Sequence, residues 1–280
     1  MLEKAKKDRP STSQIVIPAR LASTRLPKKL LLCETGKPLI QHTYEAACRA
    51  RRPRGVIVAT DHEEIARAVE SFGGRVVMTD ADLTSGTDRV AQAALGLDDI
   101  DLIVNVQGDE PELSADSIDR VIELLESEPD AVMSTLATPV RTRTTLENPA
   151  CVKVVLDDRR RALYFSRSPI PHPRQWDDSL LEEARPPFLL HLGIYAYRRE
   201  FLLRLANMPP SRLERIEKLE QLRVIEAGHA IAVGIVDEPS IGIDTPGEYQ
   251  AFVARVRAAH PTAAPFAPHA AIPTPPPMVT

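Results

Sequence analysis

Residues 14–29 read QIVIPARLASTRLPKK, in which an apolar, β-rich run passes directly into a loop with four cationic side chains. Between several further runs of this kind the apolar residues recur at helical spacing instead. The further runs are residues 56–60 (VIVAT), 75–78 (RVVM), 102–106 (LIVNV) and 131–140 (AVMSTLATPV). Strands that are apolar throughout and alternate with helices are typical of a parallel sheet covered on both faces. The first half is therefore predicted to be a doubly wound α/β domain.

Three helices are predicted between these runs, because each candidate segment follows a residue that favours a helix start and carries an apolar stripe. They are residues 39–50 after Pro38, residues 62–71 after the cap Asp61, and residues 115–127 after the cap Ser114.

The second half of the chain has a different pattern. Residues 151–156 (CVKVVL) and 162–166 (ALYFS), joined by a turn at residues 157–158, predict an antiparallel hairpin. A proline-broken stretch follows, and then an apolar run at residues 188–197 (FLLHLGIYAY). We expect residues from about 150 to 200 to form an antiparallel insertion on the α/β core. Beyond it the α/β pattern returns, with a helix at 213–227, a strand at 230–236 and a helix at 246–259.

The composition excludes several classes of protein. The chain has 280 residues, a formal net charge of −4, 26% charged residues and 43% hydrophobic residues, an ordinary globular profile. This near-neutral balance argues against a nucleic-acid-binding surface. No apolar run approaches the roughly 18 residues that span a bilayer. Three widely spaced cysteines fit a reducing cytoplasm better than a disulfide framework or a zinc site, so we expect a cytoplasmic protein that does not insert into membranes.

The two ends of the chain differ from its body. Residues 1–13 are charged and lack the apolar stretch of a signal peptide, so we expect a disordered leader there. Residues 261–280 (PTAAPFAPHAAIPTPPPMVT) are rich in proline and alanine and are expected to form a disordered tail. Residues 14–260 are then expected to form one domain.

The loop after the first strand is the first candidate binding site. In open parallel sheets, ligands bind at the carboxyl ends of the strands. The cations Arg20, Arg25, Lys28 and Lys29, with two hydroxyls and the backbone amides of this loop, suit a polyphosphate. The alternative is a solvated basic surface loop. Neither a G-x-x-x-x-G-K-[ST] nor a G-x-G-x-x-G motif occurs in the chain, which argues against a P-loop kinase and a dinucleotide enzyme.

Two aspartates at distant strand ends are candidate metal ligands. Asp109 follows a buried strand within NVQGDEP, and Asp244 lies in GIDTP. Mg²⁺ usually takes one or two protein carboxylates and completes its shell with phosphate and water, so this pair would suffice. The alternatives are an ordinary turn residue for Asp109 and a helix cap before Pro246 for Asp244.

Nine strings follow one another along residues 14–257: IPARLASTRLPKKLL, ATDHEEIARAVESFGG, TSGTDR, VNVQGDEP, VKVVLD, ALYFSRSPIP, HLGIYAYR, LERIEKLEQLR and GIDTP. In this order they resemble the 3-deoxy-manno-octulosonate cytidylyltransferases (CMP-Kdo synthetases). The shorter strings also resemble sialic-acid cytidylyltransferases and other sugar nucleotidyltransferases. The resemblance implies the Rossmann-like nucleotide-diphospho-sugar transferase fold: a mixed, mostly parallel sheet with helices on both faces and an antiparallel insertion.

The resemblance also implies roles for individual residues. Arg20, Arg25 and Lys29 match positions that bind the CTP triphosphate, and Asp109 and Asp244 match the Mg²⁺ carboxylates. Of these, Arg20, Lys29, Asp109 and Asp244 would be catalytic. The loops near the cytidine contain Thr60, Ser85, Gly86 and Thr87. The acid sugar would be held by Gln107, His191, Tyr195, Glu220 and Gln221, with Arg167 a further candidate for its carboxylate.

Structural roles remain open for part of this set. A histidine between leucines on a strand, such as His191, is otherwise more often a hydrogen-bonded core residue. Tyr195 and Glu220 are also compatible with structural roles, and Arg212 and Lys218 are interpreted as surface charges. Three positions depart from the family pattern: Lys28 and Leu30 replace the usual glycine and proline, and Leu190 replaces a common basic residue.

The implied reaction is transfer of CMP from CTP to the anomeric hydroxyl of 3-deoxy-D-manno-octulosonate (Kdo), which gives CMP-Kdo and pyrophosphate for lipopolysaccharide biosynthesis. The resemblance further implies Mg²⁺ as the cofactor and a homodimer formed through residues 150–200. Two alternatives remain: a cytidylyltransferase for an amino-modified octulosonate or sialic acid, and a non-catalytic nucleotide-binding module.

Overall fold

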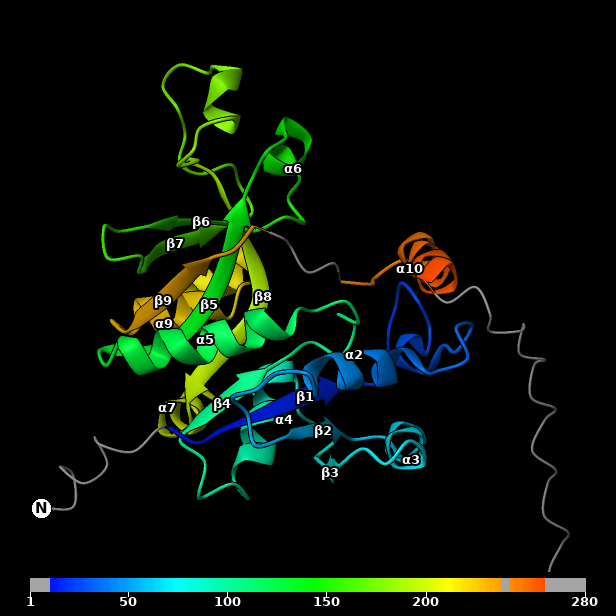
Figure 1. The fold of residues 1–280 in the computed structure, drawn as a ribbon. Helices are drawn as coiled ribbons and strands as arrows, with labels where there is room; N and C mark the ends of the chain where they lie inside the picture. Colours follow the sequence, from blue (N-terminus) through cyan, green and yellow to red (C-terminus); the bar gives the residue numbers. More distant parts are fainter. Residues whose placement is uncertain (1–10, 238–241, 260–280) are drawn as a thin grey trace, which may run out of the picture.

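The computed structural model describes residues 11–237 and 242–259, and one nine-stranded sheet runs through both halves of the chain. Its parallel part is built around β1 (Ser13–Ala19), drawn in dark blue in Figure 1. Every residue of this strand is buried. β1 pairs in parallel with β2 (Val56–Thr60) on one side and with β4 (Leu102–Asn105) on the other. β3 (Val76–Met78) adds to the outer edge of β2. The parallel sheet predicted for the first half is therefore confirmed.

The remaining strands are of mixed direction. β8 (Leu189–Arg198) lies antiparallel between β4 and β5 (Ala131–Pro139), and β9 (Ala230–Ile235) is parallel to β5. The order of the main path is β3-β2-β1-β4-β8-β5-β9. The hairpin of β6 (Lys153–Leu156) and β7 (Ala162–Ser166) joins the sheet through β6, which pairs with β8.

The position of β8 corrects one expectation. The apolar run at residues 188–197 was expected to belong to an antiparallel insertion, whereas β8 is an inner strand of the main sheet. An inner strand is covered on both faces, which is why this run is apolar at nearly every position. The predicted hairpin at residues 151–166 is confirmed. In Figure 1 the hairpin lies beside the upper parts of β5 and β8, and α6 (Arg143–Glu147) lies above it.

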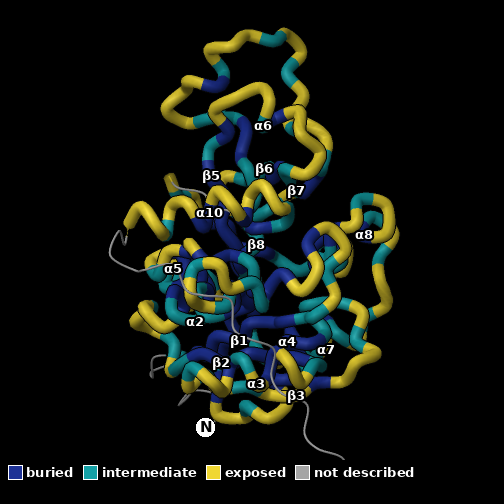
Figure 2. The backbone as a smooth tube through the Cα atoms, turned by 90° about the vertical axis from the view of Figure 1, so that its right-hand side faces the viewer, coloured by how far each residue is buried: buried dark blue, intermediate teal, exposed yellow. Residues whose placement is uncertain are grey.

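Helices cover both faces of the sheet, and alternate residues of β1 face the two sides. Ile15 and Ile17 pack in one apolar cluster, and Val16 packs in the other. The first cluster is covered by α2 (Leu39–Ala47), α3 (Glu63–Ser71) and α5 (Ala115–Ser127). The second is covered by α4 (Gly86–Ala94), α7 (Arg199–Leu205) and α9 (Gln221–Glu226). Figure 2 shows the buried strands enclosed by helices whose outer turns are exposed.

Two predicted helix features are wrong. The cap of α3 is His62, whose Nδ1 accepts a hydrogen bond from the Glu64 N–H at 3.1 Å, while Asp61 pairs instead with Arg89 at 2.9 Å. The helix expected at residues 213–227 is divided into α8 (Arg212–Glu217) and α9, because Lys218 adopts a left-handed φ of 56° that ends α8. Apolar periodicity continues across this break, so it carried no signal of the division.

The other predicted helices are present. α5 has its expected cap, Ser114, and α10 (Pro246–Ala259) has its expected bounds, whereas α2 stops at Ala47, short of the predicted residue 50. Short 3-10 turns occur at η1 (Lys29–Leu31) and η2 (Asp178–Leu181).

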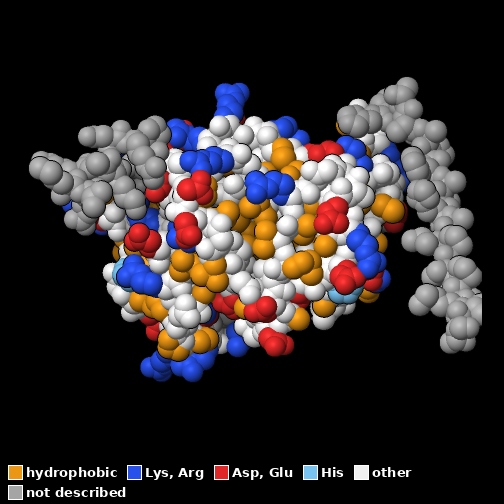
Figure 3. Space-filling view, turned by 90° about the horizontal axis from the view of Figure 1, so that it is seen from below, with side chains coloured by type: hydrophobic (Ala, Val, Ile, Leu, Met, Phe, Trp, Pro, Cys, Tyr) orange, Lys and Arg blue, Asp and Glu red, His pale blue; other side chains and the backbone are white. Residues whose placement is uncertain are grey.

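The ends of the described region correct a boundary. Thr12 donates a hydrogen bond to Asp101 at 2.9 Å and Ser13 begins β1, so the last residues of the expected leader belong to the fold. The rest of the leader and the tail at 261–280 lie outside the described residues. Within residues 11–237 and 242–259, no helix is long and apolar enough to cross a membrane. Acidic and basic side chains are interspersed over the face seen in Figure 3.

Candidate active site

The loops after β1 and β4 meet at one edge of the sheet, because the two strands are parallel neighbours. Gly108 makes this approach possible: a Cβ there would lie 3.3 Å from the Pro18 carbonyl oxygen and 3.3 Å from Ile40 Cδ1. The Thr43 hydroxyl donates a 2.9 Å hydrogen bond to the Gly108 carbonyl. The backbone of the NVQGDEP loop is therefore held directly beside the basic loop.

Lys29 joins the two candidate metal carboxylates. Its Nζ donates hydrogen bonds to Asp109 and, at 2.9 Å, to Asp244. Arg25 pairs with the other oxygen of Asp244 at 2.8 Å. Two of the predicted cations, Arg25 and Lys29, thus meet the two predicted carboxylates, and these four residues come from three distant parts of the chain.

The electrostatics of this cluster favour the charged forms. Burial opposes the charge on Lys29, but the neighbouring carboxylates of Asp109 and Asp244 outweigh it and raise the pKa of Lys29 above its usual value. Burial likewise opposes the charge on Asp244, yet the hydrogen bonds and charges of Lys29 and Arg25 lower its pKa. At neutral pH the lysine is therefore protonated and the Asp244 carboxyl is ionised.

Asp244 does not cap α10. The Glu248 carboxylate accepts hydrogen bonds from the N–H groups of Asp244 and Thr245, both at 2.8 Å, and the Glu248 N–H donates to Thr245 Oγ1 at 3.3 Å. This reciprocal arrangement caps the helix through Thr245 and Glu248. The Ile243 N–H donates to the Asp109 carbonyl at 2.9 Å, which holds the two aspartate segments together. The helix-cap alternative for Asp244 is therefore wrong, and its carboxylate faces the basic loop.

The structure shows the surroundings of all three departures from the family pattern. Lys28 has a left-handed φ of 51°, a conformation that glycine adopts at the least cost, and it also pairs with Glu64 at 2.6 Å. Leu30 is buried, and its side chain packs beside Gly108. The third, Leu190, packs against an apolar cluster that contains Phe188 and Leu181.

Two cavities meet at this cluster. The basic-loop cavity, of about 490 Å³, is lined by the loop residues Arg20, Arg25 and Lys29. The β8 cavity, of about 820 Å³, is lined by side chains from β8 and from the break between α8 and α9. Both cavities share five lining residues: Gly86, Gln107, Asp109, Glu220 and Asp244. The carboxylates therefore stand at the boundary between the two spaces.

Each cavity has a buried polar atom that no described residue satisfies. Arg20 Nη2 is buried and has no hydrogen-bond partner among residues 11–237 and 242–259, and Arg20 lines the basic-loop cavity. Gln221, only 5% exposed, lines the β8 cavity, and its Nε2 has no partner within the described part of the chain. Buried polar groups in folded proteins are usually paired, so unpaired donors at cavity walls indicate ligand positions.

His191 and Tyr195 form the β8 wall of the larger cavity. His191 Nε2 lies 3.0 Å from the Thr135 hydroxyl, and its ring contacts those of Phe165 and Tyr195. Burial lowers the pKa of His191 to about 3. Burial also raises the pKa of Tyr195 well above its usual value. Both rings are therefore neutral at physiological pH, so they present hydrogen-bonding groups and no charge.

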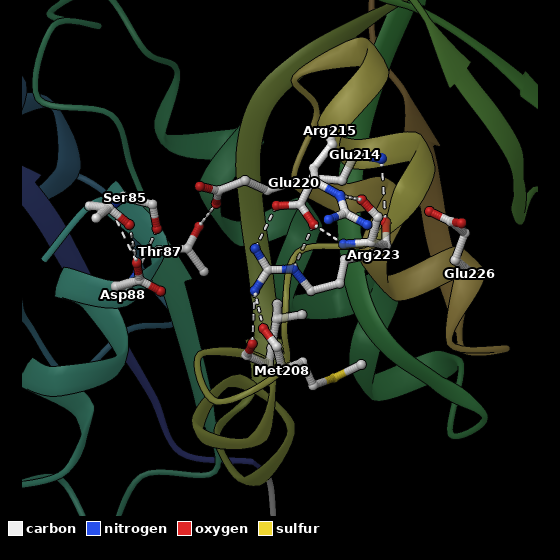
Figure 4. A network of polar contacts seen from close by, with 12 residues as sticks. Ser85, Thr87, Asp88, Met208, Glu214, Arg215, Glu220, Arg223 and Glu226 are labelled. Carbon is white, nitrogen blue, oxygen red and sulfur yellow. Dashed lines mark hydrogen bonds and ion pairs between the residues drawn. The ribbon is translucent and has the colours of Figure 1, made fainter.

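Glu220 bridges the two sides of the site. The Thr87 hydroxyl, on α4, donates a hydrogen bond to the Glu220 carboxylate at the start of α9, and Figure 4 shows the two side chains pointing toward each other. Arg223 holds the adjacent helices through Glu214, at 2.7 and 2.5 Å, and through the Met208 carbonyl at 3.0 Å.

The structure brings together most of the predicted site. Gly86 and Thr87 line the β8 cavity, and Ser85 lines the basic-loop cavity while also capping α4 through its side-chain oxygen. Thr60 and Arg167 line neither cavity. Thr60 is fully buried and accepts a 3.2 Å hydrogen bond from the His62 N–H. The Arg167 guanidinium is bound to the carbonyls of Pro149 and Glu217, at 3.0 and 2.8 Å.

Sequence reasoning missed several lining residues. Asn105 and Glu110 line the β8 cavity and belong to the VNVQGDEP string. Their closeness in sequence to Gln107 and Asp109 could have identified them as candidate site residues. Lys218, interpreted as a surface charge, is exposed but also borders this cavity. The sequence around Lys218 did not predict this position, because the residue borders the cavity as a result of the left-handed turn between α8 and α9.

Comparison with known proteins identifies the family of this chain. A family described as cytidylyltransferase matches residues 14–231. A relative from Rhodopirellula baltica, a 3-deoxy-manno-octulosonate cytidylyltransferase, is 52% identical over 86% of this chain and 97% of its own length. An 8-amino-3,8-dideoxy-manno-octulosonate cytidylyltransferase from Shewanella woodyi is 46% identical over 86% of this chain and 97% of its own.

A solved structure gives the same result. It is a CMP:2-keto-3-deoxy-manno-octonic acid synthetase complexed with CTP, with a TM-score of 0.82, 40% identity, and coverage of 89% of this chain and all of its own. The fold class expected from the resemblance is therefore confirmed, and the fold and site define a nucleotidyltransferase. The chain belongs to the cytidylyltransferase family, among the relatives that are named for the transfer of CMP to 3-deoxy-manno-octulosonate.

Proposed function

We propose that this protein transfers CMP from CTP to the anomeric hydroxyl of Kdo and releases pyrophosphate. The observation that carries the proposal is the meeting of the two cavities at Asp109 and Asp244. One cavity has a basic loop with an unpaired guanidinium nitrogen, which suits a triphosphate. The other offers the rings of His191 and Tyr195 and the Gln221 amide, whose Nε2 has no partner within the described residues, as hydrogen-bonding groups for a sugar acid. Transfer between two substrates requires such a boundary, with the reacting atoms in line across it.

The basic loop would handle the charge of the triphosphate. The acceptor oxygen forms a bond to the α-phosphorus, the bond from that phosphorus to the pyrophosphate oxygen breaks, and the hydroxyl proton is released to solvent. Arg20 and Lys29 would neutralise the charge that grows on the leaving pyrophosphate, and Arg25 would assist from the exposed side. Ser85, Gly86 and Thr87 would lie toward the cytidine, together with the more distant Thr60.

A divalent cation, Mg²⁺, fits the donor set at the boundary. Two carboxylates converge there, and in the described residues no cluster of three or more His, Cys, Asp or Glu residues is arranged for a metal. Such a pair matches the few protein ligands that Mg²⁺ takes beside phosphates. Asp109 and Asp244 would hold the ion, which supplies charge neutralisation at the phosphates and a lower pKa for the acceptor hydroxyl. Lys29, which now joins the two carboxylates, would turn toward the triphosphate.

The β8 cavity would hold the acid sugar. Gln221 offers its unpaired amide, and Gln107, His191 and Tyr195 line the same space. Glu220 would accept hydrogen bonds from sugar hydroxyls on the side where it contacts Thr87. Because His191 and Tyr195 stay neutral, these contacts would not change with pH in the physiological range.

The cellular location, the pathway and the oligomeric state are proposed from the similarity to the cytidylyltransferase relatives. We place the reaction in the cytoplasm, in the supply of an activated sugar for lipopolysaccharide. The homodimer would form through the part of residues 150–200 that lies off the main strand path, which is the β6–β7 hairpin and the loop that follows it.

The test is pyrophosphate release by the purified full chain with Mg²⁺ and Kdo. CTP should support turnover far better than ATP or GTP. Equal turnover with ATP would refute the assignment to cytidylyl transfer, and an absence of turnover with every acid sugar would leave only the nucleotide-binding module.

The amino-modified octulosonate is the second candidate acceptor, favoured by the Shewanella woodyi relative at 46% identity. The same phosphate loop and carboxylates would serve both acceptors. A comparison of kcat/KM for Kdo, its 8-amino analogue and sialic acid would decide between them, and we expect Kdo to be preferred.

A further inference from the structure

Lys153 is a cation enclosed in the protein beside the β8 cavity. It lies on β6 and is fully buried. Its Nζ donates three hydrogen bonds to carbonyl oxygens: those of Asn148 at 3.0 Å, Cys151 at 2.5 Å and Arg167 at 2.6 Å. No carboxylate among residues 11–237 and 242–259 forms an ion pair with it. A buried charge is costly unless its donors are satisfied, so these three acceptors hold their segments in a defined arrangement around the ammonium group.

One of the three acceptors, Cys151, belongs to a wall of the β8 cavity, which is lined by residues 150–152. A second acceptor, Asn148, lies two residues before this wall segment, and β6 follows directly after it. The Val152 carbonyl accepts a 2.8 Å hydrogen bond from the His191 N–H. Lys153 therefore sets the path of a segment whose backbone contacts a predicted sugar-binding residue.

The third acceptor connects Lys153 to a second wall. The Arg167 side chain donates to the carbonyls of Pro149 and Glu217. The Glu217 carboxylate in turn accepts from the Ser166 hydroxyl at 2.6 Å and from the Arg167 N–H at 3.0 Å. Glu217 is the last residue of α8, and residues 218–221, which follow it directly, line the β8 cavity.

We propose that Lys153, acting through Arg167 and Glu217, is a positioning residue for the acid-sugar side of the site. It fixes residues 148–152 relative to residues 218–221, and so places the unpaired Gln221 amide opposite His191. This inference rests on the proposed function for the identity of the ligand. Of these two wall segments only Glu220 also lines the basic-loop cavity, so the effect falls on the acid sugar and leaves the triphosphate nearly untouched.

The test compares two cations that donate hydrogen bonds to backbone carbonyls, the fully buried Lys153 and the half-buried Arg198. Lys153→Met keeps the length and bulk of the side chain and removes its three donors. Arg198→Met is the matched control, because the Arg198 guanidinium also donates to backbone carbonyls, those of Ala131 at 2.8 Å and Leu125 at 2.9 Å, but Arg198 lines neither substrate cavity. Both variants should lower the melting temperature. Only Lys153→Met should raise KM for Kdo, by roughly tenfold or more, with KM for CTP changed less than twofold.

A second variant serves as the test if Lys153→Met does not fold. Arg167→Met acts at the more exposed end of the same network and should raise KM for Kdo by roughly fivefold. Hydrogen exchange on the full chain should be faster at the amides of residues 148–152 and 218–221 in the Lys153 or Arg167 variant, and unchanged there in Arg198→Met.

The outcomes separate the two proposals. An unchanged KM for Kdo in a folded variant, or an equal rise in both KM values, would overturn the positioning role. So would unchanged exchange at both wall segments. A wild-type chain that fails to turn over Kdo with CTP would refute the proposed function instead, and the exchange measurement would still decide whether Lys153 aligns the two walls.

Discussion

The two cavities that meet at Asp109 and Asp244 are built in different ways. The basic-loop cavity presents charged side chains that are paired with one another and partly open to solvent: the side chains of Arg25 and Asp244 are 64% and 43% exposed. Beside the carboxylates of Glu110 and Glu220, the β8 cavity presents the neutral rings of His191 and Tyr195 and the Gln221 amide. The cation behind its wall, Lys153, is fully buried and bound to carbonyl oxygens.

This difference separates two tasks. Ion pairs at a solvent-exposed edge are worth little and exchange partners at low cost, so they are suited to a charged ligand that must bind and leave. A buried polar network is strong only when every member is satisfied, so it is suited to holding a fixed shape. Substitutions on the first side should therefore change turnover and metal dependence, and substitutions on the second should change acceptor binding and stability.

The largest effect is expected at the two boundary aspartates. Asp109→Asn or Asp244→Asn should lower kcat by roughly 10²–10³, the loss typical of one preorganised transition-state contact. The melting temperature should change little, and excess Mg²⁺ should partly restore the weaker variant. Initial rates over a range of Mg²⁺ concentrations measure this.

Thr245→Ala is the control for the aspartates, because Thr245 caps α10 beside Asp244. It should cost about 1 kcal/mol of stability and leave the Mg²⁺ dependence unchanged. If Asp244→Asn behaved in this way too, with full activity, the metal role of Asp244 would be wrong.

The next effect concerns pH and the neutral β8 wall. The folded pKa of His191, about 3, lies below its unfolded value, so the unfolded chain takes up a proton first as the pH falls below about 6.5. Stability from this residue is thus present at high pH and is lost progressively down to about pH 3. Between pH 7 and pH 5 the protonation of His191 in the unfolded chain should lower the free energy of unfolding of the wild type by about 2 kcal/mol. The His191→Gln variant should lack this contribution. Urea unfolding at the two pH values measures it, and equal losses in the two proteins would contradict a neutral, buried His191.

Gln221→Leu should separate binding from stability. Because Gln221 Nε2 has no partner within the described residues, its replacement should leave the free energy of unfolding unchanged or raise it by up to about 1 kcal/mol. KM for Kdo should nevertheless rise roughly tenfold, equivalent to about 1.4 kcal/mol, while KM for CTP stays constant. A less stable variant with an unchanged KM for Kdo would show that the amide serves the fold and not the ligand.

The smallest effect is expected in the basic loop at Lys28. Lys28 has a left-handed φ, a conformation that costs a residue with a Cβ about 1–2 kcal/mol. Glycine avoids this cost, but it loses about 0.5–1 kcal/mol through its greater conformational entropy in the unfolded chain. Lys28→Gly should therefore be more stable than Lys28→Ala by about 1 kcal/mol, since both variants lose the pair with Glu64. Thermal unfolding of the two variants makes the comparison. Equal stability would mean that the loop relaxes out of the left-handed conformation.

Much of the nucleotide side was predictable because its signals are local. Buried strands such as residues 14–18 are apolar throughout, and the parallel direction of β1, β2 and β4 then places the loops after them at one edge of the sheet. The cations from Arg20 to Lys29 and the carboxylate of Asp109 could therefore be assigned to that edge before any contact was known. The string motifs added Asp244, which no periodicity would have linked to the basic loop.

The acceptor side depended on contacts between distant segments. Hydrophobic periodicity is the same for an inner strand and for an apolar strand of an insertion, so the place of β8 between β4 and β5 was not visible in residues 188–197. The break at Lys218 interrupts a helix whose apolar spacing continues. The role of Lys153 depends on carbonyls at Asn148 and Arg167 that only the folded hairpin brings to it.

The sequence by itself determined the α/β class, most of the elements and the chemistry of the basic loop, because each of these follows from residue type and spacing within a few turns of chain. Only the tertiary structure decided that Lys29 joins Asp109 to Asp244 and that Asp244 is not a helix cap. It also decided that Gln221, whose Nε2 has no partner within the described residues, lines a cavity. Side chains far apart in sequence meet only after the sheet order and every helix packing angle are set. The free energy of those long-range contacts, unlike periodicity, has no local signature.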